Sequence, residues 1–261
     1  MANAEVSLYR EVFSAGTHDQ LFQSLLHDIP WQQHRITVYG RSLPAPRLSA
    51  WYGDPGASYR YSGLRLQPLP WIHTLLKVKA TVQALAGIGF NSVLLNLYRD
   101  GRDSVGWHSD AEPELGRNPV IASVSLGAER RFLLQHKKRG DCIALTLAPG
   151  SVLLMRGATQ HFWRHQLPKT KHQVGPRINL TFRIIQPSGS TPKTHAEKSA
   201  SAYSTRSSPA CSRFIVATPC TAPFIGTMGP ARHLEVQPQL LTESLVRQAP
   251  ARTAGLLLSD P

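Results

Sequence analysis

Hydrophobic residues recur along this chain with two different periods, and the period changes near Phe90. Before that residue, apolar side chains return every three or four positions in two segments, which predicts amphipathic helices over residues 17–30 and 70–87. After it, six short apolar segments are separated by turn residues, as in consecutive β-strands. Short strands that follow two helices predict a mainly β fold, a sandwich or barrel with flanking helices packed on one side.

The composition divides the chain into three parts. We expect residues 1–35 to form an N-terminal extension that contains the first helix, and residues 36–187 to form the folded domain. From Ser188 onward the sequence is rich in Ser, Thr and Pro and shows little periodicity. Residues 188–261 are therefore predicted to be a disordered C-terminal tail.

The formal net charge of +13 comes mainly from the part that is expected to fold, because 22 of the 29 basic and 12 of the 16 acidic residues precede Ser188. A basic folded domain favours a polyanionic partner such as nucleic acid, because each neutralised phosphate releases counterions. Solubility alone also explains such a charge. The charge therefore suggests a partner class without deciding it.

The cysteines and the chain start bear on the compartment. Three cysteines that form no C-x-x-C pair favour a reducing compartment and argue against a cysteine zinc site. No signal peptide is visible at the start, and no apolar stretch approaches the roughly 20 residues that cross a bilayer. We expect a cytoplasmic protein (nuclear in a eukaryote) that is a monomer and has no membrane partner.

The segment VGWHSDAEPELGR, residues 105–117, carries a candidate metal site. His108 and Asp110 are two residues apart, so on an extended backbone they project from the same face. Two such ligands make two thirds of a facial triad, which leaves other positions of the metal open. The third ligand would be a later histidine, and the candidates are His136, His161, His165 and His172. We favour His165, which lies in a segment of strand character, and His161 is its main rival.

The segment RINLTFR carries a second polar pattern. Its period of two places Arg177, Asn179, Thr181 and Arg183 on one face and apolar residues on the other. The two arginine backbones would stand roughly 20 Å apart, and two long guanidinium side chains suit a small dicarboxylate between them. In NLY, Asn96 and Tyr98 likewise share a strand face. Taken alone, such arginines more often form salt bridges or phosphate contacts.

These strings together resemble a known family. NLYRDGRDSVGWHSDAEPELGR, IASVSLG, PGSVLLM, WRHQLP and PRINLTFR, with PRLSAWYGD and YRYSG upstream, resemble the AlkB family of iron(II)- and 2-oxoglutarate-dependent dioxygenases, in its nucleic-acid-demethylating branch. The resemblance covers about residues 36–186 and not the tail. It implies a double-stranded β-helix (jelly-roll) core, and it makes residues 36–187 the dioxygenase domain.

The resemblance also implies roles for the polar residues. Fe(II) would be held by His108, Asp110 and His165, because the family's second histidine stands just before a polar-Leu-Pro turn, as in HQLP. The two carboxylates of 2-oxoglutarate would be bound by Arg177 and Arg183. The remaining hydrogen bonds to this co-substrate would come from Asn96, Tyr98 and Asn179.

The reaction implied by the resemblance is oxidative demethylation. With Fe(II), 2-oxoglutarate and O2, the chain would demethylate N-alkylated bases such as 1-methyladenine and 3-methylcytosine in alkylated DNA or RNA, releasing formaldehyde, succinate and CO2. A flipped base is commonly held between aromatic rings. By resemblance these rings are Trp51, Tyr52, Tyr59 and Tyr61. Tyr39 stands where relatives carry a wedge residue, and Glu112 stands near the exocyclic amine of the base.

Three alternatives stay open at this point. A dioxygenase of the same fold could act on a protein or a small molecule, against which the positive charge and the tyrosines argue. A non-catalytic nucleic-acid-binding protein would have no need for an intact ligand set and both arginines. A zinc hydrolase could use the same two histidines and one aspartate, but it gives no reason for the arginine-bearing face of RINLTFR.

Overall fold

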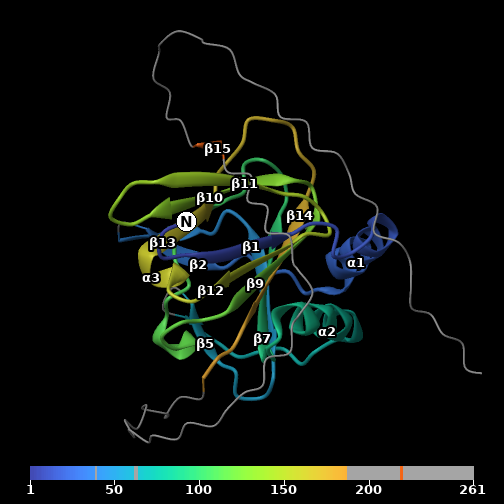
Figure 1. The fold of residues 1–261 in the computed structure, drawn as a ribbon. Coiled ribbons are helices and arrows are strands. Elements are labelled where there is room, and N and C mark those ends of the chain that lie inside the picture. Colours follow the sequence, from blue (N-terminus) through green and yellow to red (C-terminus); the bar gives the residue numbers. More distant parts are fainter. Residues whose placement is uncertain (39, 62–63, 187–217, 220–261) are drawn as a thin grey trace, which may run out of the picture. The chain divides into compact units, whose positions relative to one another are not determined.

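The computed structural model describes residues 1–38, 40–61, 64–186 and 218–219, all of them within one compact unit, Met1–Thr221. In this part of the chain two antiparallel sheets form a sandwich, and helices cover the outer face of the larger sheet (Figure 1). The predicted class, a mainly β jelly-roll core with flanking helices, is confirmed.

The larger sheet has six strands and the smaller sheet has five. In spatial order the larger sheet contains β1 (Glu5–Tyr9), β12 (Val152–Arg156), β9 (Ile121–Gly127), β14 (Arg177–Arg183), β7 (Ser92–Tyr98) and β4 (Leu48–Gly53). The smaller sheet contains β15 (Thr218–Pro219), β11 (Cys142–Leu147), β10 (Arg130–His136), β13 (Trp163–Leu167) and β8 (Val105–His108). Because the chain passes repeatedly from one sheet to the other between β7 and β14, residues distant in sequence meet between the two sheets.

Two hairpins and three helices complete the described fold. The hairpins are β2 (Arg35–Val38) with β3 (Arg41–Pro44), and β5 (Tyr59–Tyr61) with β6 (Leu64–Leu66). The helices are α1 (Ala15–Asp28), α2 (His73–Ala86) and the single-turn α3 (Thr159–Phe162), and a 3-10 turn covers Pro113–Leu115. The two predicted helices correspond to α1 and α2. The six predicted strands correspond to β7, β9, β10, β11, β12 and β14.

Strand β14 shows how the sequence pattern makes two cores. Ile178, Leu180 and Phe182 are fully buried against the apolar faces of α1 and α2, and Phe182 lies parallel to the Trp71 ring at 6.5 Å. Because neighbouring residues of a strand point to opposite faces, the polar residues of β14 point toward the smaller sheet. A second apolar core lies on that side, around Trp163. The candidate site is therefore built between the two sheets.

The N-terminal residues are part of the larger sheet. Strand β1 pairs with β12 along its whole length, from Glu5 opposite Arg156 to Tyr9 opposite Val152, and α1 buries Leu25 completely. Residues on both sides of the predicted boundary at residue 35 pair in sheets, and the boundary itself stays a prediction.

The predicted disordered tail lies outside the described residues, except that Thr218 and Pro219 pair with Ala144 and Ile143 of β11. Among the helices that the structure describes, none is long and apolar enough to span a membrane.

Candidate active site

His108, Asp110 and His165 meet at one end of the space between the sheets. Strands β8 and β13 are antiparallel neighbours in which His108 and His165 are directly paired, and Asp110 follows β8. The ligand atoms of the three side chains lie within 4.8 Å of one another, and the two imidazole rings are 4.3 Å apart between centroids. Two nitrogens and one carboxylate oxygen at this spacing form a 2-His-1-carboxylate set, a donor combination that suits Fe(II) with open positions.

The protonation states of these side chains suit metal binding. The Nδ1 of His108 lies 2.8 Å from the carbonyl oxygen of Gly106, so a proton on Nδ1 leaves Nε2 free for a metal. Burial, with smaller effects of His108 and other neighbouring charges, lowers the pKa of His165 to about 3 and keeps its imidazole neutral. Burial raises the pKa of Asp110, but the charge of Arg183 and the nearby histidines together lower it below its ordinary value. Metal ligands must be deprotonated in this way.

The other three candidate histidines lie away from this ligand cluster. His161 lies on α3, and its Nε2 contacts the carbonyl oxygen of Arg117 and the Asn118 amide oxygen, the latter at 3.1 Å. His136 is 4% exposed, and its Nδ1 accepts hydrogen bonds from two backbone N–H groups of the β10–β11 turn. His172 is exposed in the loop before β14. The structure therefore brings His165, and not its rivals, to the other two ligands.

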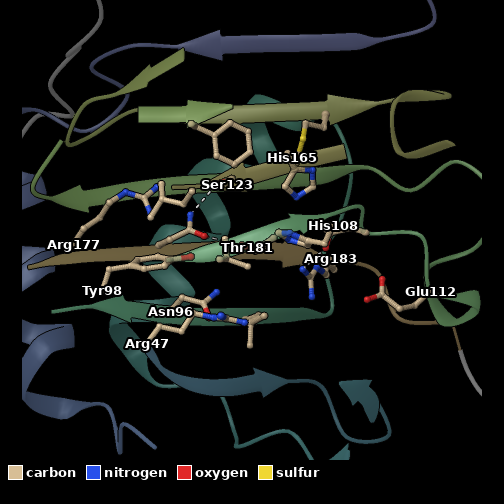
Figure 2. Close-up of a pocket in the computed structure, with 17 residues that line it drawn as sticks. Arg47, Asn96, Tyr98, His108, Glu112, Ser123, His165, Arg177, Thr181 and Arg183 are labelled. Atoms are coloured by element: carbon tan, nitrogen blue, oxygen red, sulfur yellow. Dashed lines mark hydrogen bonds and ion pairs between the residues drawn. The ribbon is translucent and has the colours of Figure 1, made fainter. Parts of the chain in front are cut away.

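Arg177 occupies the opposite end of the cavity from the histidines, beside Tyr98 (Figure 2). The residue is 2% exposed, and its guanidinium donates to Ser125 Oγ at 2.9 Å and lies 5.5 Å from the Tyr98 ring. Burial lowers its pKa to about 10, although Tyr98 acts in the opposite direction. Its Nε is buried and has no hydrogen-bond partner among the described residues. A buried donor of this kind suits an anionic ligand, because leaving it unpaired costs free energy.

Arg183 lies at the metal end. Its Nη2 forms an ion pair with Asp110 Oδ1 at 2.6 Å, and both side chains are at most 4% exposed. Such a charge-assisted bond orients the carboxylate toward the position between the two histidines. The predicted contact of Arg183 with a carboxylate of 2-oxoglutarate stays a prediction beside this observed pairing.

Arg47 is a cavity residue that the sequence did not single out. It is 5% exposed and donates to Asn96 Oδ1 at 3.0 Å and to the Ser104 carbonyl oxygen at 3.3 Å. With Arg177 and Arg183 it gives the cavity lining three guanidinium groups against two carboxylates. Its segment, PRLSAWYGD, was recognised, but a single arginine before a strand has no pattern that shows its direction.

The predicted co-substrate residues differ in their hydrogen bonding. Asn96 and Tyr98 line the cavity, as expected from their shared strand face. Asn179 also lines it, but its amide nitrogen donates to Ser123 Oγ at 2.7 Å and to the Val124 carbonyl oxygen at 3.0 Å. Its amide oxygen accepts from Thr181 Oγ1 at 3.0 Å. Asn179 is therefore engaged by the protein, and direct contact with a co-substrate requires it to exchange these partners.

Comparisons with known proteins show the family to which this chain belongs. Residues 5–183 match the model of the 2OG-Fe(II) oxygenase superfamily. Alpha-ketoglutarate-dependent dioxygenase alkB homolog 3 of Bos taurus is 44% identical over 179 residues, 65% of this chain and 62% of the relative. DNA oxidative demethylase ALKBH2 of Homo sapiens is 40% identical over 188 residues, 68% of this chain and 72% of the relative. This chain belongs to the AlkB family of 2OG-Fe(II) oxygenases.

A solved structure of OsALKBH1 shares the fold with this AlkB-family chain. The two have a TM-score of 0.50 at 20% identity, over 68% of this chain and 97% of the other. The chain spans somewhat less than two thirds of the bovine alkB homolog 3. Membership of the AlkB family implies Fe(II) and 2-oxoglutarate, and the residues present fit both groups. The donor set is the one that Fe(II) oxygenases use, and the unpaired Nε of Arg177 fits a carboxylate.

The aromatic residues expected to sandwich a base are placed differently in this AlkB-family chain. Trp51 is 3% exposed, donates through Nε1 to the Ala57 carbonyl oxygen at 3.0 Å and packs in the core between the sheets. Tyr52 is equally buried, in the core on the helix side. Neither ring lines the cavity, and their predicted contacts with a substrate stay predictions beside this observed core packing.

The other substrate-side predictions stand as follows. Glu112 lines the cavity, and Figure 2 shows it on the far side of Arg183 from Arg177. The backbone of Tyr59 and Tyr61 belongs to the hairpin of β5, while their side chains lie outside what the structure describes. Tyr39 also lies outside the described residues. Only Glu112 among these four therefore has an observed place in the cavity.

Arg130 is a further buried residue near the site. It is 3% exposed, and its guanidinium donates to three backbone carbonyl groups, those of Asp100, Asp103 and Pro168, at 2.7 to 3.1 Å. The first two belong to the loop between β7 and β8, and the third follows β13. Arg130 therefore ties together the two strands that carry the histidine ligands.

Proposed function

We propose that this chain is an Fe(II)- and 2-oxoglutarate-dependent dioxygenase that oxidatively demethylates N-alkylated bases in DNA, such as 1-methyladenine and 3-methylcytosine. The observation that carries the proposal is one cavity with His108, Asp110 and His165 at one end and the buried, incompletely paired Arg177 at the other. The names of two relatives, a dioxygenase and a DNA oxidative demethylase, support the reaction and the substrate class.

Five residues of the cavity have a part in the proposed reaction. His108, Asp110 and His165 hold Fe(II), and Arg183 keeps the Asp110 carboxylate ionised and oriented. Arg177 binds a carboxylate of 2-oxoglutarate. Bound Fe(II) and 2-oxoglutarate, with O2, supply the oxidising power, and succinate and CO2 are the coproducts. The oxidised N-methyl group leaves as formaldehyde and the base is restored.

The walls of the cavity keep water away from the reacting groups. Its apolar lining consists of Leu94, Val105, Phe132, Met155 and Leu167. The Phe132 ring stacks on His165 at 5.3 Å between ring centroids, which restricts the orientation of this imidazole. Low dielectric around the site strengthens the ion pair of Asp110 and the attraction of Arg177 for a carboxylate.

The alternatives make different predictions from the same residues. A zinc hydrolase would have no use for Arg177 at the far end of the cavity. A non-catalytic binding protein would have no use for two neutral histidines and an ionised aspartate placed side by side. A dioxygenase acting on a protein or a small molecule shares the whole site. RNA as a second substrate, a monomeric state and a cytoplasmic or nuclear compartment stay predictions.

One assay tests the proposed function. The protein is loaded with Fe(II) under anaerobic conditions and then given 2-oxoglutarate, air and a DNA oligomer that carries 1-methyladenine; formaldehyde, succinate and the repaired base are measured. We expect all three in equal amounts. An unmethylated oligomer should yield no formaldehyde, and repeating the assay with RNA and with single- and double-stranded DNA ranks the substrates.

Matched variants make the assay specific for the metal site. His108→Ala should abolish product formation, whereas His161→Ala, which removes a histidine outside the ligand set, should retain it. Equal activity of His108→Ala and the parent protein would refute the proposal. Succinate formation with a protein or small-molecule substrate, and none with methylated nucleic acid, would favour the alternative dioxygenase.

A further inference from the structure

Gln160 lies on α3, the single turn between β12 and β13, and is 1% exposed. Its side-chain oxygen Oε1 accepts a hydrogen bond from the backbone N–H of Asp110 at 2.9 Å. Its amide nitrogen lies 3.5 Å from the sulfur of Met155, which lines the cavity. Gln160 itself is absent from the cavity lining, so it acts on the site only through its neighbours.

The hydrogen bond from Asp110 matters because of where β8 ends. The strand ends at His108, and the described pairing of β8 with β13 stops at that residue. Asp110 therefore lacks the ladder of backbone bonds that holds His108 and His165. Two side chains hold it instead: Arg183 bonds its carboxylate, and Gln160 bonds its backbone N–H. The bond from Arg183 orients the Asp110 carboxylate, and the bond to Gln160 fixes the position of the Asp110 backbone.

Helix α3 is itself held by the N-terminal strand. Thr159, next to Gln160, accepts a hydrogen bond from the backbone N–H of Glu5 at 2.9 Å and donates to the carbonyl oxygen of Arg156. Lys137 donates from Nζ to the backbone carbonyl of Gln160 at 2.8 Å. The single turn is thus tied to β1, to β12 and to the end of β10, which leaves its glutamine little freedom.

We propose that Gln160 is a positioning residue for the iron ligand Asp110, and that Thr159 and strand β1 hold Gln160 in place. The inference rests on the proposed function, because it assumes that His108, Asp110 and His165 bind a metal. Partners that orient metal ligands without touching the metal typically change metal affinity by about 10- to 100-fold when they are removed. We expect a loss of about tenfold here, since Arg183 still holds the carboxylate.

The test measures metal binding and not turnover. Gln160→Met keeps the length of the side chain and removes both polar atoms. Co(II) replaces Fe(II), because its visible absorption reports the geometry of its ligands and no reaction follows. We expect Gln160→Met to bind Co(II) about tenfold more weakly than the parent, with an altered absorption spectrum. The control is Gln135→Met, because Gln135 accepts two hydrogen bonds from Arg164 on the smaller sheet and is outside the cavity lining; this variant should match the parent.

A second variant covers the case in which Gln160→Met does not fold. Thr159→Val preserves shape and removes the hydroxyl that anchors α3 to Glu5, and it should weaken Co(II) binding in the same direction by a smaller factor. The inference would be overturned if a folded Gln160→Met bound Co(II) with the affinity and spectrum of the parent. If only Thr159→Val folds, the same result in that variant would overturn it. A parent protein whose Co(II) binding is absent, or unaffected by His108→Ala, would overturn the proposed function as well.

Discussion

Replacing Arg177 with methionine should separate the binding of 2-oxoglutarate from the stability of the fold. Arg177 is 2% exposed, its guanidinium donates to Ser125, and its buried Nε has no hydrogen-bond partner among the described residues. No carboxylate within salt-bridge distance of it occurs in that part of the chain either. A residue that was there for stability would be expected to have its donors satisfied; one that is there to bind a ligand would not.

The effect on the metal-free protein follows from the pKa. Burial lowers the pKa of Arg177 to about 10, from an ordinary value of ~12.5. At ~1.4 kcal/mol per pKa unit, holding the charged form in the fold costs about 3 kcal/mol. Because the folded-state pKa is the lower one, this cost is present below pH 10 and disappears as the pH rises toward the unfolded-state value.

Methionine removes this cost and also removes two favourable contacts. The charged hydrogen bond to Ser125 is worth roughly 1.5–3 kcal/mol, and the contact with the Tyr98 ring about 0.5–1 kcal/mol. The gains and losses nearly cancel, so Arg177→Met should change the free energy of unfolding by no more than about 1 kcal/mol. Loss of the bond to a 2-oxoglutarate carboxylate, at ~1.5–3 kcal/mol, should weaken co-substrate binding by roughly 10- to 100-fold.

Three measurements check this pair of expectations. Urea unfolding of the metal-free protein gives the stability, and the KM for 2-oxoglutarate, with the thermal shift that 2-oxoglutarate causes in the Co(II)-loaded protein, gives the binding. The control is Arg164→Met, which removes an arginine of β13 that lies over Trp107 and bonds Gln135 away from the cavity. An unchanged KM in Arg177→Met, or a loss of several kcal/mol of stability with normal binding, would refute the reasoning.

Three further predictions concern the same site. The metal-free protein should lose stability as the pH falls from about 6.5 toward 3, because unfolded His165 takes up a proton that the folded residue, with a pKa of about 3, does not. When the free energy of unfolding in urea is plotted against pH, the slope should be smaller by about one proton in His165→Leu than in the parent. An unchanged slope would contradict the assignment. Asp110→Asn should abolish the visible absorption of bound Co(II). It should also destabilise the fold by roughly 3–5 kcal/mol, because Arg183 loses its buried, charged partner. Retained Co(II) binding would exclude Asp110 as a ligand. Arg130→Met should cost about 3 kcal/mol in urea unfolding, because three carbonyl groups lose their donor; a change below 1 kcal/mol would mean that water replaces it.

The polar face of the site could be predicted from sequence because a strand has only two faces. Once RINLTFR is recognised as a strand, Arg177, Asn179 and Arg183 must share a side, whatever the strand pairs with. The same holds for Asn96 and Tyr98 on β7. The structure places all five along one cavity. The third metal ligand was harder, because its position depends on the pairing of β13 with β8, and spacing alone left several histidines open.

For the aromatic residues of β4, strand geometry and family resemblance lead to different expectations. Trp51 and Tyr52 are consecutive residues of β4, so they point to opposite sides and cannot both meet one substrate from the strand. Both sides of β4 are covered, by the core between the sheets and by the core under the helices, and both rings are buried. A strand covered on both faces has no polar side that would show in its sequence. The family motif assigned both rings to one substrate, whereas the fold packs one ring into each core.

The supports of the metal ligands leave no sequence pattern at all. Asp110 and Gln160 are 50 positions apart, and Glu5 and Thr159 are 154 apart. In both contacts the donor is a backbone N–H, which every residue except proline carries, so no residue type marks the partner. A ligand is constrained by the chemistry of the metal and is restricted to a few residue types, whereas its support needs only an acceptor at the right place. This is why the sequence could narrow the ligands to His108, Asp110 and a later histidine, while Gln160 and strand β1 became visible beside Asp110 only in the folded chain.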